Sequence, residues 1–373
     1  MDFTFRPEQE AMRRAARSLL EREAGRDAVR RMVDDGAHLP DRLWSQLVEL
    51  GWVGLLVPEE HGGSGLGLVD LVVVQEELGR RVLPGPFLSS AVLATLAARR
   101  LGATELLRRV AGGGRGTLAL EESGSGTGDP LDAVACRAEP TEQHDDPAGA
   151  WLLDGLKPVV LDADTADWAL VVAHDGTGLA TFLVEHPEAE PVPALDVTRR
   201  VARLALSRRP ARRVGPPGDQ TGLLRRVVDD VAVALCAETL GACDAALEMA
   251  VEYATVRVQF GRPIGSFQAI RHKIVDMLHQ LELARVGTHY AAWTSDTESD
   301  DRAAAAAMAK GFVGEAAAMI TGETIQVHGG VGFTWDADCH LYFRRVKQND
   351  VLFGRSGWHR QRLADLVLGP NER

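Results

Sequence analysis

The sequence is poor in cysteine and has no long hydrophobic run. Its 373 residues include four cysteines, and none of them forms a CxxC pair, which argues against a zinc ribbon and against a disulfide framework. No stretch of about 18 uncharged apolar residues occurs, and the N-terminus carries acidic residues where an export signal would have an apolar core. We therefore expect a cytoplasmic protein that is neither exported nor embedded in a membrane.

Positive charge is also in short supply. Acidic residues outnumber basic ones, so that the net charge is −12 and the isoelectric point is about 5.4. Nucleic acids and anionic membranes are bound by basic surfaces, so we expect neither as a partner. The histidines have no ligand-like spacing, and the acidic run at 162–167 lacks the glutamate and glycine of a calcium loop, so we expect no metal site.

The chain falls into three parts of different texture. It is long enough for more than one domain, and its 45% hydrophobic content is enough for a full-sized core. Residues 1–115 have apolar residues at helical spacing, interrupted by turns rich in Gly and Pro. Residues 116–217 contain short runs typical of strands, which predict a small antiparallel barrel or sandwich, and we expect the arginine-rich run 207–220 to leave it as a loop. Residues 218–373 return to helical spacing.

The third part predicts a helical bundle. Two of its segments, 221–256 and 266–295, exceed the usual length of a globular helix, and long paired helices are typical of bundles. The alanine-rich run 303–310 is expected to be a helix surface or a tight packing seam. A helix–barrel–helix order does not match a Rossmann unit, and neither a GxGxxG motif after a strand nor a P-loop is present. If a nucleotide binds, it must be bound by another kind of motif.

Two stretches near the C-terminus suggest such a motif. The first is "RVQFGRPIGSFQAIRHKIVDM". It contains an arginine whose guanidinium matches phosphate geometry, together with flat rings and an amide. The second, "IQVHGGVGF", has an amide before three glycines, so that a dinucleotide could lie directly on the backbone. The alternatives are a helix–turn–helix with a solvated arginine for the first, and a helix C-cap with a tight turn for the second. The candidate cofactor-binding residues are Arg257, Phe260, Phe267, Gln268, Gln326, Gly329 and Gly330.

These stretches, with "LGWVGLLVPEEHGGSGLGLVDLVVVQEELGR" in the first part, resemble the acyl-CoA dehydrogenase family of flavoproteins over nearly the whole chain. The resemblance implies an N-terminal α-helical domain (1–115), a central β-barrel domain (116–217) and a C-terminal four-helix bundle (218–373). It also implies that FAD lies between the β-domain of one subunit and the helices of its neighbour. The seven candidate residues would then hold its adenylate and pyrophosphate end.

The reaction that the resemblance implies needs a base. In this family a carboxylate removes the α-proton of an acyl-CoA thioester while the β-hydride passes to the flavin, and an electron-transferring flavoprotein then takes the electrons. Here Phe353 and Val231 stand at the two positions where relatives carry the glutamate. Leu161 stands where relatives place a hydroxyl beside the flavin ring, and the loop "LALEESGSGTGDP" (118–130) replaces their Thr-Glu-Pro loop at that ring. The nucleotide end therefore looks intact, while the ring end and the base look eroded.

Three carboxylates near Val231 are candidate replacements. Glu238 and Asp230 are the candidate bases, and Asp229 is a candidate substrate-binding residue. A base needs a raised pKa, and the apolar surroundings of Glu238, "ALCAETLGA", predict one. The alternatives are that both aspartates lie near the start of a helix, where acids favour the dipole, and that Glu238 pairs with an arginine inside the bundle.

Two functions remain open. The chain can be a catalytically silent subunit that pairs with a homologous acyl-CoA dehydrogenase subunit carrying the glutamate, and lends half of a shared flavin site in a heterotetramer. The resemblance extends to bacterial heterotetramers of this kind that act on steroid side chains, and we favour this interpretation. The chain can instead be a self-sufficient homotetramer with a non-standard base. Other flavin chemistry, such as nitroalkane oxidation or hydroxylation, is a third and weaker alternative.

Overall fold

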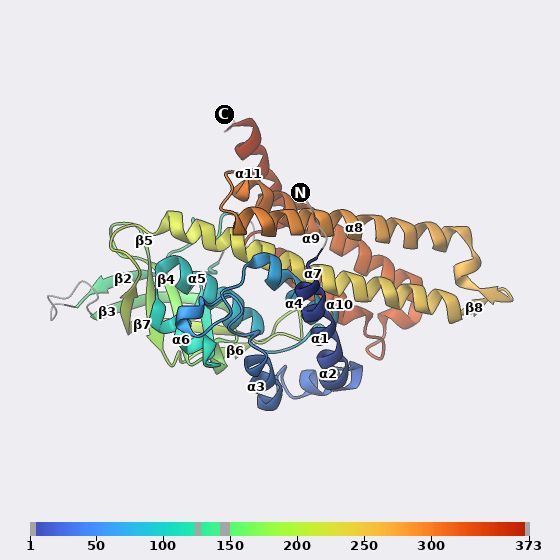
Figure 1. Ribbon diagram of the computed structural model, residues 1–373, viewed down its shortest axis with the longest axis horizontal. Coiled ribbons are helices and arrows are strands. Elements are labelled where there is room, and N and C mark those ends of the chain that lie inside the picture. Colours follow the sequence, from blue (N-terminus) through green and yellow to red (C-terminus); the bar gives the residue numbers. More distant parts are fainter. Residues whose placement is uncertain (1–4, 124–127, 142–149, 370–373) are drawn as a thin grey trace.

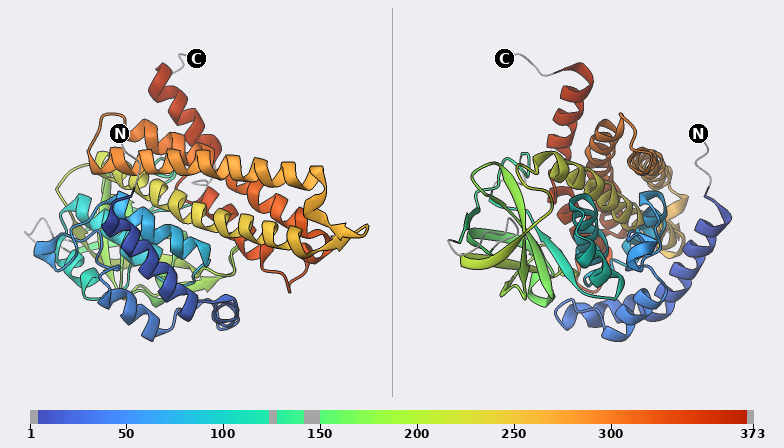
Figure 2. Two further views of the ribbon diagram at one scale, coloured as in Figure 1. Left: turned by 45° about the vertical axis from the view of Figure 1, so that its right-hand side comes forward. Right: turned by 60° about the vertical axis from the view of Figure 1, so that its left-hand side comes forward.

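The N-terminal part of the chain is helical, as its texture predicts. The structure is a computed structural model that describes residues 5–123, 128–141 and 150–369, so that residues 124–127 of the loop at 118–130 lie outside it. The first helices of this part (7–49) lie on the outside of the protein, while those at 68–101 are mostly buried against the bundle and the barrel (Figures 1 and 2). They are α1 (Pro7–Glu23), α2 (Arg26–Asp34), α3 (Asp41–Glu49), η1 (Glu59–His61), α4 (Leu68–Arg80), the π-helix η2 (Phe87–Ala94), α5 (Thr95–Leu101) and α6 (Thr104–Ala111).

The central part is a seven-stranded sheet that closes on itself. The strand β5 pairs with both β4 and β7, so that the order β4-β2-β3-β7-β5 forms a ring, with β1 added beside β4 and β6 beside β7. Buried alanine, valine and leucine side chains fill its interior around Phe182. The predicted β-barrel is therefore confirmed. Its strands are β1 (Gly116–Ala119), β2 (Arg137–Pro140), β3 (Ala150–Leu161), β4 (Trp168–His174), β5 (Leu179–Glu185), β6 (Glu190–Val192) and β7 (Val201–Val214), with the short helix η4 (Ala163–Thr165) after β3.

The predicted exit loop at 207–220 is wrong for more than half of its length, because β7 continues to Val214 and pairs with β3 and β5. Its arginines belong to the strand, where carboxylates on neighbouring segments hold them. The Arg209 guanidinium lies 3.1 Å from the Glu188 carboxylate, and Arg213 pairs with Asp175. A strand can carry several charged side chains when such partners are present. The local sequence does not show these partners, because they lie on other segments.

The C-terminal part is the predicted bundle of long helices, and figure 1 shows it extending away from the barrel. The alanine-rich run lies in α9, where Ala305, Ala306, Ala307 and Ala309 are buried against neighbouring helices. Its elements are α7 (Thr221–Val256), the hairpin β8 (Val258–Gln259) and β9 (Arg262–Pro263), η5 (Ile264–Ser266), α8 (Gln268–Asp296), α9 (Arg302–His328), η6 (Gly329–Phe333), α10 (Cys339–Val351) and α11 (Ser356–Leu368). These helices position both ends of the candidate site.

One segment of the bundle has the length and composition of a membrane-spanning helix. It covers α9 and η6 (Arg302–Phe333), and it is the only such segment in the described ranges. Within its most apolar window, 61% of the residues are buried inside the protein, and α9 packs on α7, α8, α10 and α11. A helix at the centre of a bundle is surrounded by apolar side chains, so it can have the composition of a membrane-spanning helix.

The N-terminal part is joined to the bundle where α4 crosses α7. A Cβ atom on Gly79 would lie 2.0 Å from the Glu238 carbonyl oxygen, and one on Gly241 would lie 1.8 Å from the Glu76 carbonyl oxygen. The two helices therefore touch backbone to backbone, which only glycine allows. This close crossing fixes the turn of α7 that carries Glu238.

Candidate functional site

The structure brings the two predicted nucleotide-binding stretches together at one end of the bundle. The first stretch follows α7, and the second covers the last turn of α9 and the residues after it. The ring of Tyr253, near the end of α7, stacks on the ring of His328, at the end of α9, with their centroids 4.4 Å apart. A second link is the ion pair of Lys273 with Glu323, whose charged atoms lie 2.6 Å apart between α8 and α9.

The candidate residues at this end are open to solvent in the single chain. Phe260 is 92% exposed, at the tip of the β8–β9 hairpin, and its ring lies edge-on to that of Phe267. Arg257, Gln268 and Gln326 are exposed as well. A Cβ atom on Gly329 or Gly330 would have no neighbour within 4 Å. A flat ring, a guanidinium, amides and bare backbone on one open surface fit the adenylate and pyrophosphate end of a dinucleotide.

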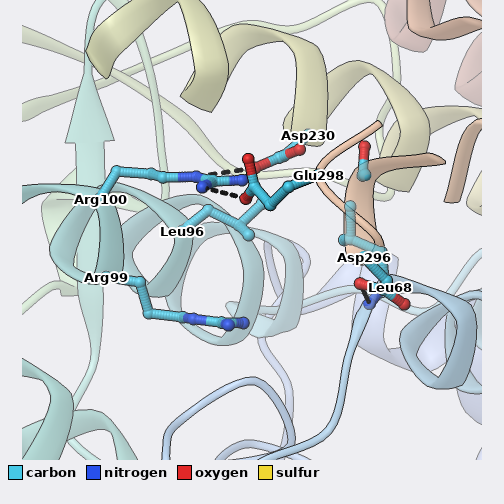
Figure 3. A pocket seen from close by; sticks show the side chains of 8 residues that line it. Leu68, Leu96, Arg99, Arg100, Asp230, Asp296 and Glu298 are labelled. Carbon is cyan, nitrogen blue, oxygen red and sulfur yellow. Dashed lines mark hydrogen bonds and ion pairs between the residues drawn. The ribbon is translucent and has the colours of Figure 1, made fainter. Parts of the chain in front are cut away.

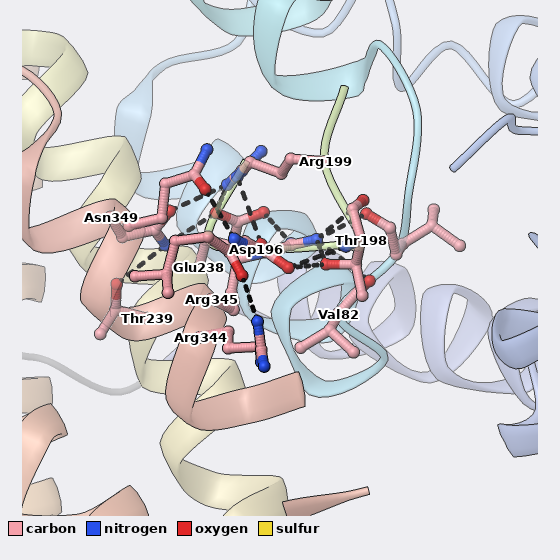
Figure 4. A network of polar contacts seen from close by, with 12 residues as sticks. Val82, Asp196, Thr198, Arg199, Glu238, Thr239, Arg344, Arg345 and Asn349 are labelled. Atoms are coloured by element: carbon pink, nitrogen blue, oxygen red, sulfur yellow. Dashed lines mark hydrogen bonds and ion pairs between the residues drawn. The ribbon is translucent and has the colours of Figure 1, made fainter. Parts of the chain in front are cut away.

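Glu238 lies in a buried polar network, shown in Figure 4, and does not face an apolar cavity. It is 3% exposed, and its Oε1 accepts a 2.8 Å hydrogen bond from Arg345. Its Oε2 accepts from the Asn349 side chain at 2.9 Å and also pairs with Arg199. Arg345 is fully buried and binds Asp196 as well, so the network joins α7 and α10 to the segment that precedes β7. The alternative that Glu238 pairs with an arginine inside the bundle is confirmed.

The expected rise in the pKa of Glu238 is wrong. Burial is the largest influence and pushes this pKa upward, but the guanidinium groups of Arg199 and Arg345 and the amide of Asn349 hold the pKa below its ordinary value. The local sequence shows only apolar neighbours, because both arginines come from distant segments. A carboxylate whose charged form is stabilised in this way is a poor proton acceptor.

Asp230 lines a polar pocket of about 210 Å³ beside α5 (Figure 3). Its Oδ2 accepts hydrogen bonds from Arg100 Nη2 at 2.9 Å and from Nε at 3.2 Å, and Arg100 also reaches Glu298. Burial raises the pKa of Asp230, and the charge of Arg100 offsets only part of that rise. Asp230 therefore has the pKa direction that a base needs, but its carboxylate is held by an arginine. The pocket residues are Leu68, Leu96, Arg99, Arg100, Asp230, Ser295, Asp296 and Glu298.

Asp229 faces another side of α7, where its Oδ2 accepts a 3.1 Å hydrogen bond from Arg362 of α11. It is fully buried. The expectation that both aspartates lie near the start of the helix is wrong, since α7 begins at Thr221, about two turns earlier. The structure therefore does not gather the three candidates into one site: successive residues of a helix point about 100° apart, and Glu238 lies eight residues, or about 12 Å, beyond Asp230.

The ring end is filled by apolar side chains at the positions compared with the family. Val231 is fully buried, Leu161 is 4% exposed, and Phe353 is 2% exposed with a positive φ of 56°. None of these side chains can accept a proton or donate a hydrogen bond to a flavin ring.

Two carboxylates at this end were not among the candidates. Asp162 directly follows Leu161 and accepts a 2.6 Å hydrogen bond from the Ser89 hydroxyl of the π-helix η2. Burial raises the pKa of Asp162 to about 6. Glu121, just after β1, accepts a 2.7 Å hydrogen bond from the backbone N–H of Phe353. The acidic run at 162–167 was interpreted as a polar turn, but Asp162 is only 5% exposed in the structure.

Comparisons with known proteins agree with this architecture. A family model described as acyl-CoA dehydrogenase, N-terminal domain, matches residues 6–113, and one described as acyl-CoA dehydrogenase, C-terminal domain, matches residues 224–368. Acyl-CoA dehydrogenase IpdE2 of Mycolicibacterium smegmatis is 32% identical over 348 residues, which are 93% of this chain and 94% of that protein.

Solved structures of similar proteins match nearly the whole chain. A variant of the Tcur3481-Tcur3483 steroid ACAD is 32% identical with a TM-score of 0.86, over 97% of this chain and 98% of that one. The ChsE4-ChsE5 complex from Mycobacterium tuberculosis is 28% identical with a TM-score of 0.87, over 99% of this chain and 100% of that one. With its helical, barrel and bundle parts and its open nucleotide end, the chain belongs to the acyl-CoA dehydrogenase family, whose cofactor is FAD.

Proposed function

We propose that this chain is the non-catalytic subunit of a heteromeric acyl-CoA dehydrogenase. Its partner is a homologous subunit that carries the catalytic glutamate, and the two chains share a flavin site. The observation that carries the proposal is that Glu238, Asp229 and Asp230 are each bound by arginine, while Phe353 and Val231 occupy the two positions of the family's base. Two of the similar structures are named for two different proteins, which is what an assembly of unlike subunits leads us to expect.

The distance between the two ends of the site also favours a shared flavin. Arg257 lies 19 residues after Glu238, which is about 28 Å along α7 at 1.5 Å per residue. Phe353 lies near the Glu238 level of that helix, because Asn349, four residues earlier in the chain, contacts Glu238. The nucleotide end and the ring end of this chain therefore lie far apart, and we infer that they serve different flavins.

The residues of the open end would hold FAD as follows. Arg257 would pair with the pyrophosphate, Phe260 would offer its face to the adenine, and Gly329 and Gly330 would let the nucleotide approach the backbone. Phe267, Gln268 and Gln326 would complete this surface. Bound there, FAD would supply the acceptor for the β-hydride of the acyl-CoA, and the carboxylate of the partner would take the α-proton. The contribution of this chain is to bind and orient the cofactor.

The substrate class and the electron acceptor belong to the same proposal. The substrate is an acyl-CoA thioester, and because one similar structure is named a steroid enzyme, steroid-derived acyl groups are the first class to test. An electron-transferring flavoprotein would reoxidise the flavin, and the assembly would be a cytoplasmic heterotetramer.

The test is to express the chain alone and together with a homologous subunit that carries the glutamate, and to measure mass and flavin content. We expect flavin only in the mixed complex, with about one FAD per two chains. A homotetramer with one FAD per chain that an acyl-CoA reduces would refute the proposal.

The second candidate is a self-sufficient enzyme, and the raised pKa of Asp230 is the observation that favours it. In that case Asp230→Asn would abolish flavin reduction by acyl-CoA in the homotetramer, by at least about 100-fold, while FAD stays bound. Full activity of that variant would exclude Asp230 as the base.

A further inference from the structure

The turn after α10 is strained. Phe353 has a φ of +56°, a left-handed conformation that costs a bulky residue about 1–2 kcal/mol, and Gly354 follows it with a φ of +91°. The Phe353 side chain is 2% exposed, so the turn is packed inside the protein. A conformation of this cost persists only where surrounding groups hold it.

Two buried polar side chains hold the Phe353 backbone from both sides. Glu121 Oε1 accepts a hydrogen bond from the Phe353 N–H at 2.7 Å. On the other side, His359 Nε2 lies 3.0 Å from the Phe353 carbonyl oxygen. Burial lowers the pKa of His359 to about 3, so the ring is neutral at physiological pH and donates its Nε2 proton to that carbonyl.

Glu121 is fixed in turn by its surroundings. It is 6% exposed, and two buried ammonium groups, those of Lys157 and Lys310, interact with its charge. Lys157 forms an ion pair with the neighbouring Glu122 at 2.5 Å, and Lys310 donates to the Asn349 carbonyl, four residues before Phe353. Movement of this carboxylate would therefore take negative charge away from two buried ammonium groups, which costs free energy.

The hydrogen bond of Glu121 joins two segments that the reaction must keep apart. Glu121 belongs to the loop compared with the flavin-ring loop of relatives, and Phe353 takes the place of their base. Dehydrogenation removes a proton and a hydride from adjacent carbons, so the acyl chain must lie between the base and the ring. In this chain the hydrogen bond between Glu121 and the Phe353 N–H, 2.7 Å long, directly connects those two segments.

We propose that Glu121 closes this chain's own acyl site by occupying the backbone N–H of residue 353. The inference rests on the proposed function and deepens it, since it explains why the chain would serve only its partner's flavin. The carboxyl group excludes the acyl thioester because it lies between the two segments and already accepts the N–H of residue 353.

The experiment counts binding sites in the complex of this chain with its partner, with acetoacetyl-CoA as the probe in isothermal titration calorimetry. We expect one site per pair of unlike chains for the wild type and two for Glu121→Ala. The Glu121→Gln variant keeps the shape and an acceptor oxygen, so it should stay at one site. The control is Glu139→Ala, which removes an exposed carboxylate from β2 of the same barrel and should also stay at one site.

Hydrogen exchange supplies a second measurement on the same samples. Freed from its acceptor, the amide of residue 353 should exchange at least about tenfold faster in Glu121→Ala, which corresponds to a loss of about 1.4 kcal/mol of protection, with the bundle unchanged. If the Ala variant does not fold, Glu121→Ser, which is too short to reach this amide, takes its place.

A variant with the faster amide but only one probe site would overturn the inference, as would unchanged exchange at residue 353 or two probe sites in the wild type. These results are distinct from failure of the proposed function, which would show as one FAD per chain and acyl-CoA reduction without a partner.

Discussion

The two ends of the site differ in what surrounds their functional groups. At the nucleotide end, Phe260 is 92% exposed and the glycines at 329 and 330 have open space around them. At the ring end, Glu238 is 3% exposed and is bound by two arginines and an asparagine. The groups at one end are exposed to solvent, and those at the other end are held by partners within the chain.

Phe353 stands at the position of the family's base, yet the ring end contains buried polar groups. Glu121 accepts a hydrogen bond from the Phe353 N–H, and Glu238 and Asp162 have buried hydrogen bonds of their own. A buried charged network of this kind is stable only when every partner is present, so single substitutions there should change folding, while those at the open end should change FAD affinity.

The largest effect should come from breaking the closed end at Glu238. Glu238→Ala leaves Arg345 and Arg199 buried without their carboxylate, which should lower the free energy of unfolding by about 3–5 kcal/mol. The folded-state pKa of Glu238 lies below its ordinary value. The ionised carboxylate therefore stabilises the protein at pH values above the ordinary pKa, and this stabilisation is lost as the pH falls through the folded-state pKa. Urea unfolding at neutral and acidic pH measures both effects.

The matched control for Glu238→Ala is Glu248→Ala on the same helix. The Glu248 side chain is 63% exposed and pairs with Arg80, so its loss should cost less than about 1 kcal/mol. Equal losses for the two variants would contradict the contrast between the buried network and the surface.

Substitution of Asp162 should increase the stability of the protein, which is opposite to the effect of Glu238→Ala. Its pKa is about 6 in the folded protein against 3.8 for an ordinary aspartate, so ionising it above pH 6 costs about 3 kcal/mol. Asp162→Asn removes this cost, keeps an acceptor for Ser89 and tolerates the positive φ of 52°. The variant should therefore gain stability over the wild type as the pH rises from 4 to 6, with no difference below pH 4. Asp132→Asn, at an exposed position in the β-domain, should show no such gain.

At the open end, Gly330→Val should weaken FAD binding without unfolding the chain. Gly330 has no neighbour within 4 Å and no positive φ, so valine fits the folded chain and clashes only with a ligand lying on the backbone. We expect at least a tenfold loss of FAD affinity, or about 1.4 kcal/mol, in the co-expressed complex. Gly222→Val places the same side chain in equally open space at the start of α7, and its FAD content should equal that of the wild type.

The sequence was sufficient for features that depend on neighbouring residues and insufficient for those that depend on distant ones. Helical spacing predicted α7 and α8 within a few residues, because periodicity is a local property. The surroundings of Glu238 were mistaken because Arg199 and Arg345 lie 39 and 107 residues away. The contact of Glu121 with Phe353 spans 232 residues, and no spacing rule reaches so far. The candidates at the open end could be proposed from the sequence, since its glycines and Arg257 lie in short continuous stretches.

The smallest effect should come from Phe260→Ala. The ring is almost fully exposed, so removing it should change the free energy of unfolding by less than about 0.5 kcal/mol. Stacking of an aromatic ring on adenine is worth about 1 kcal/mol or more, so FAD should dissociate roughly five to ten times more readily from the complex. Equilibrium dialysis of FAD against the complex measures this change, with Leu368→Ala, 83% exposed at the end of α11, as the control. Equal FAD affinity in Phe260→Ala and the wild type would remove Phe260 from the nucleotide site and leave Arg257 and the glycines to hold the cofactor.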